Sequence, residues 1–436
     1  MFTLQRAEVL RGPSAVLYGA GSSGGLLNAV SKRPEFAFGG ELGLEFGTND
    51  LKQFQADVTG ALNEADTLAG RFVGVVRDGE LQSEGQANDK YLLMPSLTWK
   101  PGKDTDVTLL MLYQDENLGT QTYLPLSKSL HAGGVGKLPI DFFVGEPGFN
   151  RMKGEHMAGT LLVNHRFADW IALSSSSRYY DQSVDYREVY GSYYTNIGVD
   201  PFIDANRTLL AREFYLLDED YQVLNSDNNV QIEFVTGALS HKVLVGVDYT
   251  RFEQDRKEGF SCRGVTDGSY NCYAGGSPPP QDVYNPNYGQ PFDYAFTNAY
   301  TTRSTQLGFY LQDQAKYGDR VSVVVGARRD RATSISSGAP ESSNRATTFR
   351  GGLIVEVAEG VSPYVSYSES FQPVFGADVN QVPFEPREGR QYEAGIKWQP
   401  SPNSLISVAY FDIEETNFLT SDPYMEIGRA SCRERV

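Results

Sequence analysis

A glycine-rich segment near the start of the chain has the spacing of a phosphate-binding loop. Residues 19–24 read Gly-Ala-Gly-Ser-Ser-Gly and match G-x-G-x-x-G, the pattern that binds a dinucleotide pyrophosphate. That chemistry needs a helix beginning inside the glycine run, because the N–H groups at a helix N-terminus hold the phosphates. Residues 26–30, followed by Lys32-Arg33-Pro34, are too short for such a helix and favour a strand ended by proline. A nucleotide-binding enzyme therefore requires a helix after Gly25, and the sequence does not predict one.

The sequence shows no pattern that is typical of a metal site or a catalytic site. The four histidines show no metal-ligand spacing: His131, His156, His165 and His241. No set of nucleophile, base and orienting residue stands out, so we expect a protein that is not an enzyme. We also expect no metal site and no cofactor of the protein's own.

Two of the three cysteines bracket a short polar segment. Cys262 and Cys272 lie beside residues 275–280 (Gly-Gly-Ser-Pro-Pro-Pro), which cannot form regular structure. A zinc site would need two more ligands close by, and the neighbouring sequence has none. The spacing therefore predicts a disulfide between Cys262 and Cys272 and an oxidising compartment.

Beyond Pro34 the chain alternates residue by residue between apolar and polar side chains. This period of two is typical of β-strands with two different faces. In the clearest case one face suits lipid and the other suits water, with Tyr392, Ala394, Ile396 and Trp398 opposed to Gln391, Glu393, Gly395, Lys397 and Gln399. The pattern predicts an all-β protein with about sixteen strands between residues 40 and 416, where plugged outer-membrane transporters have about 22.

The predicted connections alternate between short and long. Short ones are expected at 63–66, 101–104 and 400–403, and long ones at 117–153, 183–207, 256–300 and 372–386. Short turns at one rim and long loops at the other are typical of a transmembrane antiparallel β-barrel. A soluble sandwich or propeller is the alternative.

Composition agrees with a barrel and limits the partners. The 436 residues include 26 Tyr, 24 Phe and 44 Gly, and aromatic residues are typical of the girdles at both membrane interfaces. No apolar run is long enough for a transmembrane helix. The net charge of −17 argues against nucleic acid, because binding phosphates needs a basic surface.

The opening residues also carry a family resemblance. Residues 8–19 read Glu-Val-Leu-Arg-Gly-Pro-Ser-Ala-Val-Leu-Tyr-Gly, and the similarity continues through the glycines to residues 28–34. This segment resembles the last part of the plug domain of TonB-dependent outer-membrane receptors, which import iron–siderophore complexes into Gram-negative bacteria. Residues 361–373, 389–397 and 416–423 resemble the ferrichrome and hydroxamate branch of that family.

The resemblance implies a function and partners. It implies TonB-dependent import of a ferric siderophore, of hydroxamate type, across the bacterial outer membrane. The ligand would bring the iron, and the partners would be the TonB-ExbB-ExbD complex and outer-membrane lipid. The alternatives are another cargo (cobalamin, haem or a catecholate siderophore) and a passive porin, which should lack Arg11-Gly12-Pro13.

The resemblance also assigns roles to residues. Arg11 would pair in the lumen with Glu369 and Glu393 and so hold the plug to the barrel wall. A bulky iron chelate needs aromatic walls with a few polar donors. Candidates in the long loops are Tyr123, Tyr190, Tyr193, Tyr194 and Phe260.

The plug-like segment lies unusually close to Met1, so we expect a fragment. Residues 1–35 would be the C-terminal part of the plug domain and residues 36–425 an incomplete barrel that lacks its C-terminal strands. Residues 426–436 resemble a translated sequencing adapter, and we expect them to be an artefact. The TonB box would also be missing.

Overall fold

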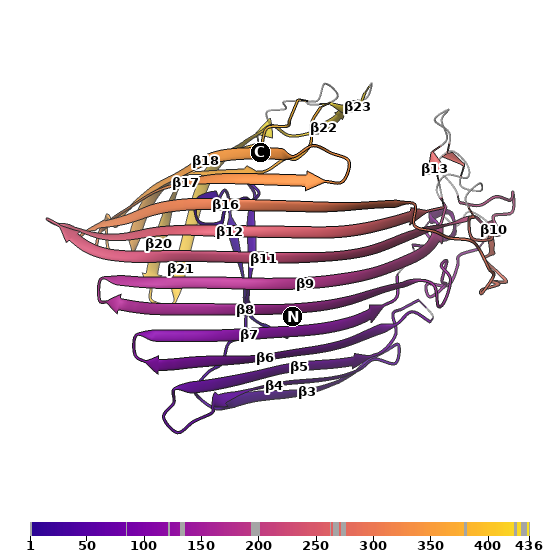
Figure 1. The fold of residues 1–436 in the computed structure, drawn as a ribbon, viewed down its shortest axis with the longest axis horizontal. Helices are drawn as coiled ribbons and strands as arrows, with labels where there is room; N and C mark the ends of the chain where they lie inside the picture. The colour runs from indigo at the N-terminus through magenta and orange to yellow at the C-terminus, as the bar shows by residue number, and fades with distance from the viewer. Residues whose placement is uncertain are drawn as a thin grey trace.

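A computed structural model describes residues 2–83, 85–120, 123–130, 136–192, 201–261, 263–264, 270–271, 276–378, 382–422, 425–428 and 434–435. Strands make up nearly all of the regular structure (Figure 1). Across these residues, helical structure is limited to α1 (Ala15–Tyr18) and the 3₁₀ turn η1 (Leu126–Lys128). None of the described helices is long and apolar enough to cross a membrane.

The first residues form a small hairpin rather than a nucleotide-binding unit. β1 (Leu4–Arg11) pairs antiparallel with β2 (Gly25–Ser31), and α1 lies in the connection between them. The glycine run is therefore followed by a strand, as predicted, and not by the helix that a pyrophosphate site requires. We call residues 4–31 the plug hairpin.

Within the described residues, most of the remaining strands form one antiparallel sheet of sixteen strands. Its spatial order follows the chain: β3 (Gly39–Phe46), β4 (Lys52–Ala61), β5 (Leu68–Asp78), β6 (Asn88–Gly102), β7 (Thr105–Leu118), β8 (Arg151–Ala168), β9 (Ile171–Gly191), β11 (Arg212–Thr236), β12 (Leu239–Phe260), β16 (Asn298–Tyr317), β17 (Val321–Ser336), β18 (Ser342–Val355), β19 (Val361–Gln372), β20 (Arg387–Ser401), β21 (Ser404–Thr416) and β24 (Glu434–Arg435). All but β24 lie between residues 39 and 416, in agreement with the strand number that the alternation predicts. The sheet curves around the plug hairpin, with β20 and β21 passing behind β11, β9 and β8 in Figure 1.

The connections alternate as predicted, with one correction. Short turns join β4 to β5, β6 to β7 and β20 to β21, and long segments follow β7, β9, β12 and β19. The loop expected at 183–207 is shorter, because β9 continues to Gly191 and pairs there with Arg212. The polar residues of this stretch resemble a loop in sequence, but ladder hydrogen bonds satisfy their backbone.

The long connections contain short strand pairs of their own. β10 (Leu209–Leu210) pairs with β15 (Gln281–Asp282), β13 (Arg263–Gly264) with β14 (Tyr270–Asn271), and β22 (Thr420–Asp422) with β23 (Met425–Gly428). The predicted disulfide between Cys262 and Cys272 lies outside the described residues.

The two faces of the sheet differ as the alternation predicts. Tyr392 is 57% exposed beside Gln391 at 6%, and Phe309 is 58% exposed beside Tyr310 at 5%. Successive side chains of a strand point to opposite faces, so an apolar outer surface and a polar inner surface share each strand. The plug hairpin lies against the inner face, where Gly19 approaches Arg328 and Gln306.

Candidate functional site

Close backbone contacts seat the plug hairpin on the inner face. Gly12 has a φ of +79°, and a Cβ there would overlap the side-chain amide of Gln391 on β20. The N–H of Gly21 donates to the carbonyl of Phe371 at 2.9 Å, and Ala15 packs against Phe371 and Ala346. Positive φ and a missing side chain both favour glycine, which explains why this segment is rich in it.

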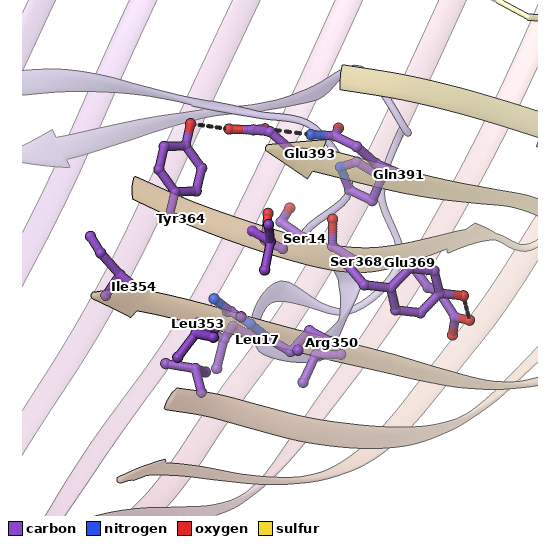
Figure 2. Close-up of a pocket in the computed structure, with 18 of the residues that line it drawn as sticks. Ser14, Leu17, Arg350, Leu353, Ile354, Tyr364, Ser368, Glu369, Gln391 and Glu393 are labelled. Carbon is purple, nitrogen blue, oxygen red and sulfur yellow. Dashed lines mark hydrogen bonds between the residues drawn. The ribbon is translucent and has the colours of Figure 1, made fainter. Parts of the chain in front are cut away.

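A cavity of about 510 Å³ is lined by residues of the plug hairpin, α1 included, and of strands β17 to β20 (Figure 2). The three residues of the predicted lock, Arg11, Glu369 and Glu393, all line it. Within the described part of the chain, however, Arg11 lies in no ion pair with either glutamate. The structure thus brings the three residues to one cavity without joining them.

Groups of the barrel wall hold both glutamates. Glu393 accepts hydrogen bonds from the Tyr364 hydroxyl at 2.5 Å and from Nε2 of Gln391 at 2.7 Å, both drawn in Figure 2. Glu369 accepts from the Tyr367 hydroxyl and from the backbone N–H of Phe349 at 2.7 Å. The β18–β19 ladder ends where Arg350 pairs with Ser368, so the Glu369 carboxylate supplies the acceptor that the strand lacks.

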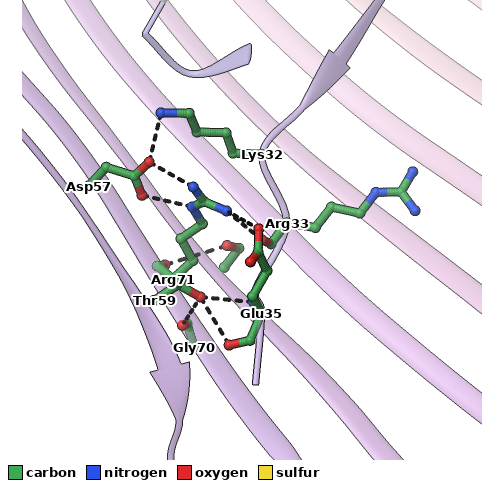
Figure 3. A network of polar contacts seen from close by, with 8 residues as sticks. Lys32, Arg33, Glu35, Asp57, Thr59, Gly70 and Arg71 are labelled. Carbon is green, nitrogen blue, oxygen red and sulfur yellow. Dashed lines mark hydrogen bonds and ion pairs between the residues drawn. The ribbon is translucent and has the colours of Figure 1, made fainter. Parts of the chain in front are cut away.

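The other end of the plug hairpin is attached through Asp57 on β4 (Figure 3). Its carboxylate accepts from Nζ of Lys32 at 2.7 Å and from Nε and Nη2 of Arg71, each at 2.7 Å. Nη1 of Arg71 donates to the Arg33 carbonyl at 2.9 Å, and the N–H of Glu35 donates to Thr59 at 2.8 Å. We call these contacts the Asp57 clamp, since one nearly buried carboxylate joins plug and barrel.

A patch of aromatic rings covers the inner face of β9, β11 and β12. Ring centroids lie 5.8 Å apart for Tyr186 and Tyr215 and 5.0 Å apart for Tyr215 and Phe260. Farther along, Tyr180 and Tyr221 are 5.9 Å apart, and Tyr221 and Phe252 are 6.1 Å apart. We call these six residues the aromatic wall.

Contacts of neighbouring residues show on which face of the sheet the aromatic wall lies. The Tyr310 hydroxyl donates to Asp227 of β11 at 2.7 Å, and Tyr310 also lies under Arg328, which approaches the plug. Tyr221 is six residues from Asp227 on the same strand, so it shares that face. The wall therefore lies on the inner face of the sheet, the face that the plug hairpin contacts.

The predicted ligand residues lie in different parts of the structure. Phe260 belongs to the aromatic wall, and the Tyr190 hydroxyl donates to Glu213 at 3.2 Å beside it. Tyr123 lies in the connection after β7 and is 51% exposed. Tyr193 and Tyr194 lie outside the described residues. Sequence reasoning did not name the other five residues of the aromatic wall, which are Tyr180, Tyr186, Tyr215, Tyr221 and Phe252. The in-phase spacing of the four tyrosines along β9 and β11 was a usable signal.

A buried ion pair organises the long connections. Nη1 of Arg212 lies 3.0 Å from Oε2 of Glu146, with the two side chains 0% and 5% exposed. Arg212 also donates to the carbonyls of Gly145 and Pro279, each at 3.0 Å. A hydrophobic cluster completes what we call the loop platform, and it contains Leu138, Val144, Phe202, Leu210 and Val283.

The histidines take part in ordinary hydrogen bonds. Nδ1 of His156 lies 2.8 Å from the Tyr180 hydroxyl, that of His165 lies 2.8 Å from Thr105, and that of His241 lies 2.8 Å from Asp313. His131 falls outside the described residues. No group of three or more His, Cys, Asp or Glu in the described ranges is arranged to hold a metal ion.

Comparison with known proteins places the chain among outer-membrane receptors. A family model described as "TonB dependent receptor-like, beta-barrel" matches residues 99–430. The ferrioxamine B receptor of Salmonella typhimurium strain SL1344 is 33% identical over 443 residues, which cover 99% of this chain and 59% of that protein. The ferrichrome outer membrane transporter/phage receptor of Escherichia coli K12 is 31% identical, over 97% of this chain and 58% of that protein. The chain thus spans less than two thirds of the length of these curated relatives.

Solved structures agree in fold. The closed form of the ferric-catecholate import receptor Fiu from E. coli K12 has a TM-score of 0.84 at 18% identity, over 100% of this chain and 66% of that one. The siderophore receptor PiuA from Acinetobacter baumannii has a TM-score of 0.80 at 21% identity, over 98% of this chain and 65% of that one. These likenesses support the barrel architecture with its inner plug, and the family match covers most of the chain. The chain belongs to the TonB-dependent receptor β-barrel family of the bacterial outer membrane.

Proposed function

We propose that this chain is the barrel and plug end of a receptor that imports ferric hydroxamate siderophores by a TonB-dependent route. The observation that carries the proposal is the aromatic wall, which faces the same space as the plug hairpin. Relatives named as ferrioxamine B and ferrichrome receptors support the cargo class.

The chemistry of the wall suits a ligand that carries its own iron. Aromatic faces supply contact area for a bulky chelate, and a few polar groups orient it. Here the Tyr186 hydroxyl donates to Glu188 at 2.8 Å, and the Tyr215 hydroxyl donates to Glu258 at 3.1 Å. Polar carboxylates therefore lie beside the aromatic rings. No bond of the cargo would be made or broken. TonB-ExbB-ExbD would supply the energy, and a plug hairpin against the wall argues against a passive porin.

Ligand binding to the full-length receptor tests the cargo. We expect it to bind ferric ferrioxamine B or ferrichrome, and Tyr215→Ala to weaken binding about tenfold, or about 1.4 kcal/mol. Tyr179→Ala is the matched control, because Tyr179 is a neighbouring β9 tyrosine that is 47% exposed on the outer face. Titration calorimetry with these ligands, a ferric catecholate, cobalamin and haem checks both points. Binding of the ferric catecholate, cobalamin or haem without binding of either hydroxamate would overturn the cargo assignment.

We also propose that Arg11, Glu369 and Glu393 hold the plug to the wall when the cavity closes. Arg11 is exposed in the structure, so Arg11→Ala in the full-length receptor should cost about 1 kcal/mol of plug stability, as for a solvated pair. Hydrogen exchange of residues 8–20 measures it. Arg6→Ala is the control, because Arg6 pairs with Glu8 inside the hairpin at 2.6 Å. Unchanged exchange and unchanged transport in Arg11→Ala would refute the lock.

A further inference from the structure

A fully buried arginine lies where the wall meets the plug. The Arg328 side chain on β17 is 0% exposed, and so is that of Asp330. Nε and Nη2 of Arg328 donate to Asp330 at 2.8 and 2.7 Å, and Nη2 also pairs with Asp248 of β12. Cζ lies 5.6 Å from the centroid of the Tyr310 ring. Two carboxylates and a ring thus fix the plane of the guanidinium.

Two glycines lie against this guanidinium, one on the barrel wall and one on the plug. A Cβ at Gly308 on β16 would overlap Nη2. A Cβ at Gly19 of the plug would sit 3.0 Å from Nη2 and 3.2 Å from Nε2 of Gln306. The φ of Gly19 is +76°, which also disfavours any other residue. Arg328 therefore fills the space between the wall and the plug.

The contact between Arg328 and Gly19 differs from an ion pair. Gly19 brings no charge, and the charge of Arg328 is met by Asp330 and Asp248 of the wall itself. The plug can leave such a surface without separating opposite charges, whereas separation of a buried ion pair strands a charge and is costly. Release of the plug from Arg328 therefore carries no cost of charge separation.

We propose that Arg328 is the seat of the plug, a positioning residue whose guanidinium seals the gap at Gly19 while the receptor is at rest. Glycine at position 19 allows the seal, and glycine at position 308 lets the arginine lie flat on the wall. The inference rests on the plug-and-barrel architecture and not on the identity of the cargo.

Leak conductance of the full-length receptor in planar bilayers, without any siderophore, tests the seal. Gly19→Ala should raise the ion leak about tenfold, which corresponds to about 1.4 kcal/mol of lost seating. Gly21→Ala controls for an added methyl group in the same connection, because a Cβ at Gly21 would find its nearest atom at 4.0 Å. We expect its leak to stay at the wild-type level. Equal leak in the two variants would overturn the proposal.

Arg328→Lys provides a second and independent measurement. Lysine keeps the charge beside Asp330 but lacks the planar fork, so this variant should leak by itself. Without the fork, the methyl group that Gly19→Ala introduces no longer meets Nη2. Alanine at residue 19 keeps the backbone strain of a φ of +76°, so the Gly19→Ala/Arg328→Lys receptor should leak somewhat more than Arg328→Lys. Its leak should still stay clearly below the product of the two single increases, a non-additive result for residues in contact. A tight Arg328→Lys receptor or additive leaks would each contradict the seat, even where Gly19→Ala fails to insert.

Discussion

Replacing Glu146 with glutamine should open the loop platform while leaving the barrel intact. Glutamine keeps the shape of the side chain but removes the charge that faces Arg212, whose side chain is 0% exposed. An uncompensated buried charge costs about 3–5 kcal/mol. The two carboxylate oxygens accept separately from Arg212 and from the N–H of Gly289, and glutamine has a single side-chain oxygen, so the substitution affects two long connections.

Hydrogen exchange mapped by peptide measures this effect. Peptides covering residues 138–150 and 276–292 should lose protection, because their opening free energy is set by local packing and not by global unfolding. Peptides from β17 and β20 should not change. Asp78→Asn is the control for charge removal, since Asp78 pairs with Lys52 at 3.7 Å with both side chains well exposed. Such pairs contribute about 0–1 kcal/mol. Equal protection in both variants would show that the ion pair does not organise the loops.

The sequence predicted the faces of the strands because that signal is local. Tyr392 and Gln391 differ in character at adjacent positions, and a strand turns that difference into an outer and an inner side chain. The same logic predicted the strand after Gly25. It failed at residues 183–191, where polar side chains suggested a loop although ladder partners were available from β11.

The site itself was predictable only in part. Phe260 is recognisable as an aromatic residue near a long loop, but its stacking partner Tyr215 is distant in sequence. The seat at Arg328 is harder still, because Gly19, Asp248 and Gly308 come from three separate segments. Packing across a curved sheet brings them together, and no local pattern of residue types encodes that packing.

Replacing Asp57 with alanine should release the C-terminal end of the plug hairpin from the barrel. Lys32 and Arg71 would lose their shared carboxylate while their side chains are only 15% and 11% exposed. Glu35 is 58% exposed and would stay 3.4 Å from Arg71. We expect the free energy that attaches the plug hairpin to the barrel to fall by about 3 kcal/mol, near the lower end of the range for a broken buried ion pair.

Lys32→Met separates the attachment of the plug from the stability of the barrel strands. It keeps the twofold contact between Arg71 and Asp57, so β4 and β5 stay joined, and it keeps an apolar side chain over Phe2, whose ring centroid lies 4.2 Å from the Lys32 ammonium. Hydrogen exchange should therefore rise at residues 31–36 in both variants but at β4 and β5 only in Asp57→Ala. Protection of residues 31–36 at the wild-type level in Asp57→Ala would mean that the backbone contacts of Arg33 and Glu35 are enough to anchor the plug. The clamp predicts the opposite, because those contacts pass through Arg71 and Thr59 beside the carboxylate that positions Arg71.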